Sequence, residues 1–430
     1  MRIAERGAER EFLAGLRGGE PHLWVVAFGY EFGVGLMDLD PAPDAAPPAL
    51  ALRLDTAVVL DHRTGTAELR GPDDAALDAW LEAYAAGESA APPEDICAVE
   101  DENGAKCPPE RESPPEVFGE DTRAAGRIKV GERGFGAEGP DLGAERPGLG
   151  AEWRRSGAEY EAEVDACRAA IREGEAYVLC LTDTARVRMK GPGGHDPLDL
   201  YLRLRGEGAA SRGGVIVAGD RALVSASPER FLSVRGSRIA THPIKGTRPR
   251  GVTPEADAAL AGELAADPKE RAENLMIVDL MRNDLSRVCS PGTVRTTGFL
   301  RVETHPHVHQ LVSTVEGELC PGADALDAVE ACFPGGSMTG APKRRAVQIL
   351  QQLEREPRGL YSGCFGWIDA DEAELAMTIR SVELRGIGGS RWEARVGAGG
   401  GITIDSDPAR EHAERLLKAA PLLRALGVEP

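Results

Sequence analysis

Short apolar runs near the beginning of the chain predict β-strands. LWVVAFGY, ALALRL and TAVVLD fall between residues 23 and 61, and the turn sequence HRTGT follows the last of them. The next stretch, DDAALDAWLEAYAAG, carries apolar residues at helical spacing and ends in glycine, which predicts a helix. We therefore expect residues 1–91 to form an N-terminal α/β region.

The pattern changes between residues 92 and 156, where apolar residues become sparse and prolines and charges increase. The triplet Gly-Ala-Glu recurs at 136, 143, 150 and 157, a period of seven. A coiled coil has this period, but glycine in every repeat and proline in two of them oppose a helix, and no apolar seam accompanies the repeat. The composition instead predicts a mobile linker.

Ordered patterns return at residue 157. The sequence EYEAEVDACRAAIREG predicts an amphipathic helix, the strand YVLCLT follows, and GGVIVAGDRALVSASP and FLSVRGSRIATHPI are typical of hairpins. The remaining elements mix without a regular βαβ alternation. This favours an α+β fold with antiparallel sheet over a doubly wound parallel sheet.

The formal net charge of −20 bears on what the chain is expected to bind. Nucleic acid and anionic membranes require basic surfaces, so neither is expected as a partner. The eight cysteines are scattered without a CxxC pair, and the first residues lack the apolar centre of a signal peptide, so we expect a soluble cytoplasmic protein. An anionic substrate would need cations concentrated at its site.

Two segments share the design of an acidic helix start. ADPKERAENLMIVDL and DSDPAREHAERLLKAAP each place Asp-Pro at a helix beginning, followed by two glutamates three residues apart. The pairs are Glu270 with Glu273 and Glu411 with Glu414. Together they could bind a hard divalent cation such as Mg²⁺, although acidic residues in a first helical turn commonly face water.

Two glycine-rich motifs and one cysteine motif do not match known catalytic or nucleotide-binding signatures. PGGSMTGAPK does not match a phosphate-binding P-loop, and VGAGGGITIDS does not match a dinucleotide fingerprint, but their bare backbone N–H groups can approach a carboxylate closely. The cysteine in SGCFGW lacks the spacing of a glutaminase nucleophile, so we expect Cys364 to be a buried thiol on a strand. Lys245, in HPIKGTRPRG, is either a solvated charge or a reactive amine.

Six stretches occur in an order that resembles a known family. They are PIKGTRPRG, ENLMIVDLMRNDLSRV, FPGGSMTGAPKRRA, RGLYSGCFGW, AMTIRSVEL and GAGGGITIDSDPAREHAE. The chain resembles the chorismate-binding enzymes, a family that includes the large subunits of anthranilate and aminodeoxychorismate synthases as well as isochorismate and salicylate synthases. The resemblance implies two packed antiparallel sheets with helices outside and a chorismate-binding catalytic region over residues 157–430.

The resemblance also implies roles for individual residues. Glu273 and Glu414 resemble the Mg²⁺ ligands, and Glu270 and Glu411 resemble carboxylates that support the ion through water. Glu229, in SASPERF, resembles the general acid that protonates a departing hydroxyl. The implied contacts to chorismate are Arg380, Tyr361, Ser337, Thr247, Gly399 and Gly400.

Lys245 separates activities within the family. Anthranilate synthases usually carry alanine before this glycine, whereas aminodeoxychorismate synthases carry a lysine that attacks ring C2. An unprotonated amine is required, and we expect burial beside a metal ion and arginines to lower the Lys245 pKa. Gln310 replaces the histidine usual in members that eliminate pyruvate, and His309 should face the other side of its strand.

These features predict Mg²⁺-dependent amination of chorismate at C4 to 4-amino-4-deoxychorismate. The ammonia would come from a separate glutamine amidotransferase subunit, because no glutaminase signature occurs in the chain. The alternatives are an anthranilate synthase component I, another enzyme that adds ammonia or water to chorismate at C2, or a binding subunit that no longer turns over. The landmark AFGYEFGVG lies unusually early, so we expect a shortened N-terminal region without tryptophan feedback.

Overall fold

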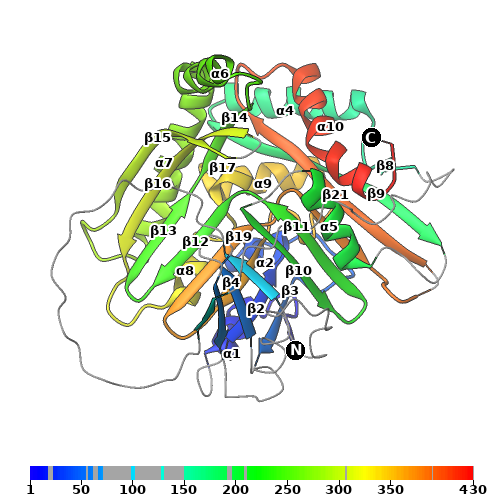
Figure 1. The fold of residues 1–430 in the computed structure, drawn as a ribbon. Helices are drawn as coiled ribbons and strands as arrows, with labels where there is room; N and C mark the ends of the chain where they lie inside the picture. Colours follow the sequence, from blue (N-terminus) through cyan, green and yellow to red (C-terminus); the bar gives the residue numbers. More distant parts are fainter. Residues whose placement is uncertain are drawn as a thin grey trace. The chain divides into compact units, whose positions relative to one another are not determined.

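The computed structural model describes residues 1–17, 23–54, 57–61, 66–70, 98–101, 127–129, 150–190, 196–207, 211–305, 308–389 and 391–429. The chain divides into two compact units (Figure 1), one made of residues 1–53 and 144–430 and the other of residues 54–143. The helix predicted for DDAALDAWLEAYAAG lies outside the described residues. Among the residues that are described, no helix combines the length and the apolar composition needed to cross a bilayer.

The larger unit contains two antiparallel sheets, which confirms the α+β prediction. The first has the strand order β1-β3-β2-β18-β19-β12-β13-β16-β14, with β15 paired to β16. Its strands are β1 (Arg2–Ile3), β2 (Leu23–Phe28), β3 (Ala49–Leu54), β12 (Arg230–Arg235), β13 (Arg238–His242), β14 (Ile244–Pro249), β15 (Arg295–Thr304), β16 (Val308–Glu318), β18 (Cys364–Ile368) and β19 (Glu372–Met377).

The second sheet has the order β10-β11-β20-β21-β9-β17, with β8 paired to β9. Its strands are β8 (Glu152–Trp153), β9 (Val178–Lys190), β10 (Arg212–Ala218), β11 (Arg221–Ser227), β17 (Gly340–Ala341), β20 (Ser381–Arg385) and β21 (Arg391–Ile402). Strand β9 is much longer than the predicted run YVLCLT, because it pairs with β21 from Lys190 opposite Arg391 to Leu179 opposite Ile402. These two long strands lie side by side in Figure 1.

Helices begin where the sequence supplies caps. Ser156 and Glu159 form a capping box on α4, and Asp324 with Asp327 does the same on α8, so each side chain satisfies an otherwise unpaired backbone N–H. The helices are α1 (Glu9–Leu16), α2 (Tyr30–Leu36), α4 (Gly157–Arg172), α5 (Pro197–Glu207), α6 (Pro254–Ala266), α7 (Pro268–Ser286), α8 (Ala325–Cys332), α9 (Lys343–Glu354) and α10 (Pro408–Ala425), with a 3₁₀ turn η1 at Gly336–Met338.

The apolar core explains how the sheets and helices are layered. Helices α5 and α10 cover one face of the second sheet through a cluster that includes Trp392, Val396 and Leu422. The opposite face of β9 contributes Cys180 to the large cluster around the first sheet. Because alternate residues of a strand face opposite sides, the second sheet is sandwiched between these helices and the core of the first sheet.

The smaller unit is a four-stranded sheet with the order β6-β4-β5-β7. Its strands are β4 (Ala57–Asp61), β5 (Thr66–Arg70), β6 (Ala98–Asp101) and β7 (Arg127–Lys129). Strands β6 and β7, together with β8 of the larger unit, fall within residues 92–156, for which the sequence predicts a linker. Runs of two to four residues are too short to produce a recognisable alternation of apolar and polar positions.

Candidate active site

Helices α7 and α10 begin as the sequence predicts. Asp267 caps α7 by accepting hydrogen bonds from the backbone N–H groups of Lys269 and Glu270 at 2.9 and 3.1 Å, and Pro268 occupies the first turn. Asp407 caps α10 in the same way, accepting from the Arg410 N–H at 2.9 Å. Both helix starts therefore present their glutamate pairs in defined positions.

The two glutamate pairs come together from these two helices. The space that a Cβ on Gly400 would occupy lies 2.9 Å from Glu411 Oε2 and 3.8 Å from Glu414 Oε1, so α10 packs against the end of β21. Burial raises the pKa of Glu273, and the nearby charges of Glu414 and Glu411 raise it further. Carboxylates that repel one another in a partly desolvated place are ready to accept a cation.

Two lysines that the sequence reasoning did not single out already neutralise part of this charge. Lys269 Nζ lies 3.7 Å from Glu273 Oε1 and 3.9 Å from Glu411 Oε1, so it bridges the two helices. Lys418 Nζ lies 2.6 Å from Glu414 Oε1 and donates to the Gly399 carbonyl at 2.8 Å. Burial opposes ionisation of Glu414, but Lys418 outweighs burial and lowers its pKa. The i,i+4 spacing of each lysine from a glutamate was the available sequence signal.

The donor set fits a hard divalent cation chemically, since it consists of carboxylate oxygens on two rigid helix starts. As the described side chains are placed, no three His, Cys, Asp or Glu residues converge closely enough to hold an ion. The ammonium of Lys269 instead lies between Glu273 and Glu411. The assignment of Mg²⁺ to Glu270, Glu273, Glu411 and Glu414 remains a prediction.

Lys245 lies on strand β14 rather than in a loop. Its Nζ is 3.8 Å from the position that a Cβ on Gly401 would take, which brings it next to the end of β21. Gly246 has φ +83°, and a Cβ there would meet Leu264 and Glu270, so only glycine lets β14 approach α7 this closely. Lys245 thus enters the site from the first sheet while Gly401 belongs to the second.

The Lys245 pKa is raised by the protein groups around it, and the lowering expected beside a bound metal ion stays a prediction. Burial alone would lower this pKa, but the charges of Glu273, Glu229 and Glu414 outweigh burial and raise it. The arginines of HPIKGTRPRG do not oppose this shift at close range, because Arg248 bonds to Glu263 and Asp267, whose carboxylates balance its charge.

Glu229 and Ser337 meet in a buried part of the same site. Glu229 is 7% exposed, and burial raises its pKa even though the Ser337 hydroxyl and the charge of Lys245 act against the shift. Ser337 is held in the turn η1 and is equally buried. A carboxyl group that resists ionisation is suited to donate a proton, which fits the predicted role of Glu229 as a general acid.

Arg380 and Tyr361 lie close to the same end of β21. Arg380 has φ +51°, a strained conformation for a residue with a side chain, and donates from Nη1 to the Lys418 carbonyl at 3.1 Å. The Tyr361 ring occupies the space above Gly397, and burial raises its pKa despite the charges of Arg358 and Arg380. The structure therefore brings Arg380, Tyr361 and Gly399 together as the sequence predicts.

Thr247 differs from the other predicted substrate contacts, because it is exposed on β14 opposite Gln310. His309 turns away from this side, as predicted: its ring bonds to Asp257 at 2.8 Å and to Thr304 at 2.9 Å. Gln310 is buried and takes the opposite face of β16. Cys364 is buried on β18, which confirms the prediction of a buried thiol on a strand, and burial raises its pKa.

Comparison with known proteins agrees with this geometry. The sequence model of the chorismate binding enzyme family matches residues 3–424. The chain belongs to this family. It is 40% identical over 430 residues to an aminodeoxychorismate synthase of Streptomyces griseus, covering 96% of this chain and 52% of that protein. It is also 43% identical over 268 residues to anthranilate synthase component 1 of Haloferax volcanii, covering 62% and 50% of the two chains.

The chain therefore spans about half the length of these relatives. Among solved structures, anthranilate synthase component I from Streptococcus pneumoniae has the same fold, with a TM-score of 0.70 and 24% identity, covering 98% of this chain and 86% of that one. An isochorismate synthase from Bacillus anthracis aligns with a TM-score of 0.62 and 20% identity, covering 98% and 89%. These likenesses establish two packed antiparallel sheets as the architecture.

Proposed function

We propose that this chain catalyses the Mg²⁺-dependent amination of chorismate at C4, using ammonia that a separate glutamine amidotransferase subunit releases. The observation that carries the proposal is the position of Lys245. Its amine lies beside Gly401, within the field of Glu229, Glu273 and Glu414. A lysine in this place is able to reach a ring held against the end of β21.

Charge complementarity supports chorismate as the substrate. Chorismate is a dianion, and the protein supplies Arg380, Lys418 and bare backbone at Gly399 and Gly400 where the two sheets meet. Glu273 and Glu414, supported by Glu270 and Glu411, would hold Mg²⁺. The bound ion would neutralise the ring carboxylate and reduce the negative field around it.

The proposed chemistry is a pair of displacements with Lys245 as a temporary nucleophile. Neutral Lys245 Nζ forms a bond to ring C2, the ring double bonds shift, and the C4–O bond breaks while Glu229 donates a proton, so water leaves. Ammonia then bonds to C4, the double bonds shift back, and the C2–Nζ bond breaks. Nζ loses one proton after attack and regains it on release, and the nitrogen newly bonded to C4 gives up one proton that restores Glu229, so the enzyme ends unchanged.

Transfer of a proton from Lys245 to Glu229 would give both groups the protonation states that the proposed reaction needs. Each of the two groups shifts the pKa of the other, because their charges interact in a buried place. A proton moved from the Lys245 ammonium to the Glu229 carboxylate produces a neutral amine and a protonated acid together. The raised Lys245 pKa is therefore compatible with nucleophilic attack, provided that this transfer occurs when substrate is bound.

The activity test uses the pure chain with chorismate, MgCl₂ and an ammonium salt, and it identifies the product by chromatography with mass spectrometry. We expect 4-amino-4-deoxychorismate and no pyruvate. Anthranilate together with an equal amount of pyruvate would contradict the proposal and favour an anthranilate synthase. Substrate binding without any turnover, at saturating ammonium and Mg²⁺, would favour a binding subunit.

Anthranilate synthesis is the second candidate function, because 43% identity to the Haloferax volcanii protein is as high as the identity to the Streptomyces griseus protein. Two features favour C4 amination over it. Lys245 provides a nucleophile for C2, and Gln310 stands where pyruvate-eliminating members usually have histidine. The pyruvate measurement separates the two functions directly.

A further inference from the structure

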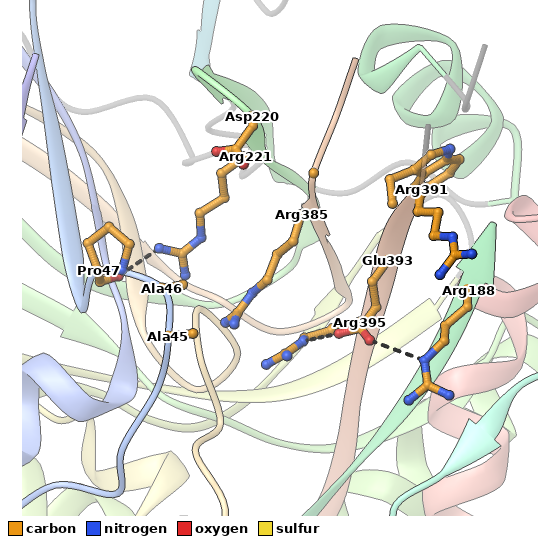
Figure 2. A pocket seen from close by; sticks show the side chains of 12 residues that line it. Ala45, Ala46, Pro47, Arg188, Asp220, Arg221, Arg385, Arg391, Glu393 and Arg395 are labelled. Atoms are coloured by element: carbon orange, nitrogen blue, oxygen red, sulfur yellow. Dashed lines mark hydrogen bonds and ion pairs between the residues drawn. The ribbon is translucent and has the colours of Figure 1, made fainter. Parts of the chain in front are cut away.

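A second site candidate lies at the other end of β21. A cavity of about 680 Å³ opens there, and Figure 2 shows its lining from close by. Five of the lining residues are arginines, and only two are carboxylates, which is unusual in a chain with a net charge of −20. The arginines are Arg188, Arg221, Arg385, Arg391 and Arg395, and the carboxylates are Asp220 and Glu393.

The cavity is separate from the proposed active site. Arg391 begins β21, and Gly400 lies nine positions further along the same strand. At the rise of a β-strand these residues are roughly 30 Å apart. Every arginine of the cavity comes from the second sheet, whereas the active site also uses β14, α7 and η1.

Strand register places the arginines on one face of the sheet. Glu393 pairs across the sheet with Arg385 on one side and Arg188 on the other, and Arg221 pairs with Arg385. The alternate residues Trp392 and Ala394 point to the opposite face and join the apolar core beneath α5 and α10. The arginine face is thus fixed by a rigid sheet rather than by a mobile loop.

Two of the arginines form one wall of the cavity and are held in place by hydrogen bonds and ion pairs. Arg385 contacts both oxygens of Asp44 at 2.6 and 2.7 Å, and both Arg385 and Arg221 contact Glu383 at 2.6–2.8 Å. Arg221 also donates to the Pro47 carbonyl at 2.7 Å. Their guanidinium groups are largely buried and neutralised, so they set the shape of the cavity more than its charge.

The open side of the cavity holds two exposed guanidinium groups, those of Arg188 and Arg391. Glu393 is shared between Arg395 at 2.5 Å and Arg188 at 3.7 Å, and the Arg188 side chain is 63% exposed. Arg188 has one further partner, Glu152, at 2.8 Å. Arg391 is exposed, and its side chain bonds to no other residue in the part of the chain that the structure describes. Figure 2 shows Arg188 and Arg391 close together beside Glu393.

We propose that this cavity binds a small polyanion, meaning a molecule with at least two phosphate or carboxylate groups. Guanidinium groups bind such groups through paired hydrogen bonds, and they keep their charge at every physiological pH. The cavity volume lies within the range of small-molecule sites. Because the rest of the protein repels anions, a local cluster of arginines with spare donors is the feature that such a ligand would need.

The test is calorimetric titration of the metal-free chain with inorganic pyrophosphate and, separately, with citrate, at about physiological ionic strength. We expect a single site that binds at least one of the two probes with a Kd below about 1 mM. Replacement of both exposed arginines, R188Q with R391Q, should weaken binding at least about tenfold, because two charge-assisted contacts are lost. R295Q is the matched control, since Arg295 is 65% exposed on β15 and makes only a 4.0 Å ion pair.

The two probes identify the kind of anion. Binding of pyrophosphate alone supports a phosphate ligand, binding of citrate alone supports a polycarboxylate, and binding of both supports a general polyanion site. No binding of either probe would overturn the proposal. So would binding that is equally strong in the double variant and in R295Q. The titration contains no chorismate, ammonium or Mg²⁺, so its outcome does not depend on the function proposed above.

Discussion

The two ends of strand β21 differ in the kind of cationic side chain that surrounds them. The end at Gly399–Gly401 is surrounded by glutamates and by Lys245 and Lys418, whereas the end at Arg391–Arg395 is surrounded by arginines. One strand of one sheet therefore serves two chemically distinct places.

The chemical difference between lysine and arginine determines what each end of β21 can do. A lysine amine can lose its proton in a protein and then act as a nucleophile, and the fields of neighbouring carboxylates and metal ions control when it does so. A guanidinium group keeps its charge and cannot attack a carbon, but it binds planar anions well. We therefore propose that the glycine end of β21 carries out chemistry and that the arginine end binds a ligand.

Glu229→Gln should produce a large effect that is confined to the glycine end. The amide keeps the size of Glu229 but cannot donate the proton that the departing hydroxyl needs, so we expect kcat for amination to fall about 10²- to 10⁴-fold. Steady-state kinetics measures this loss. Pyrophosphate binding at the arginine end should stay unchanged in the same variant, and a normal kcat would remove Glu229 from the mechanism.

Glu31 should make the free energy of unfolding depend on pH. We expect this effect to be of intermediate size and to arise outside both ends of β21. Glu31 on α2 is 6% exposed and accepts hydrogen bonds from the backbone N–H groups of Arg358 and Gly359 at 2.8 and 3.0 Å. Burial raises its pKa from 4.5 to about 7. Its contribution to the free energy of unfolding is complete below pH 4.5 and is lost as the pH rises through about 7, by up to about 3 kcal/mol.

Urea unfolding of the wild type and Glu31→Gln across this pH range measures that loss. The slope that Glu31 contributes should be absent from the variant, while the exposed Glu11→Gln serves as a control that keeps the slope. Identical pH profiles in the wild type and Glu31→Gln would contradict the assignment.

Lys269→Met should produce the smallest effect. It tests whether Lys269 competes with a divalent cation at the glycine end. The Lys269 ammonium lies between Glu273 and Glu411, where it competes with a divalent cation, so its removal should tighten Mn²⁺ binding up to about tenfold. Electron paramagnetic resonance of free Mn²⁺ measures this affinity without turnover. Arg271→Met, an exposed neighbour on α7, is the control, and unchanged or weaker binding in Lys269→Met would refute the competition.

Much of this account was available from the sequence because local signals and family motifs agree. The Asp-Pro starts of α7 and α10 can be recognised in the sequence because Asp is a preferred cap at the beginning of a helix. The resemblance places Lys245, Arg380 and the glutamates in one site. The structure then brings these residues to one end of β21, with Thr247 exposed at its margin.

Other features depend on contacts between distant segments and have weak local signals. The raised Lys245 pKa follows from carboxylates on α7, on α10 and between β11 and β12, so the motif around Lys245 did not predict it. The arginine cavity depends on cross-strand register among β9, β11, β20 and β21, which no single stretch of sequence encodes. Short strands such as β7 escape detection because three residues carry too little pattern.

The proposed role of Lys245 is tested by the rate of 4-amino-4-deoxychorismate formation by Lys245→Ala, measured together with chorismate binding by calorimetry. If Lys245 attacks C2, the rate should fall at least about 10³-fold, because the covalent route is lost. Chorismate affinity should change little, because Arg380, Lys418 and the glutamates remain. An undiminished rate in Lys245→Ala would contradict the account.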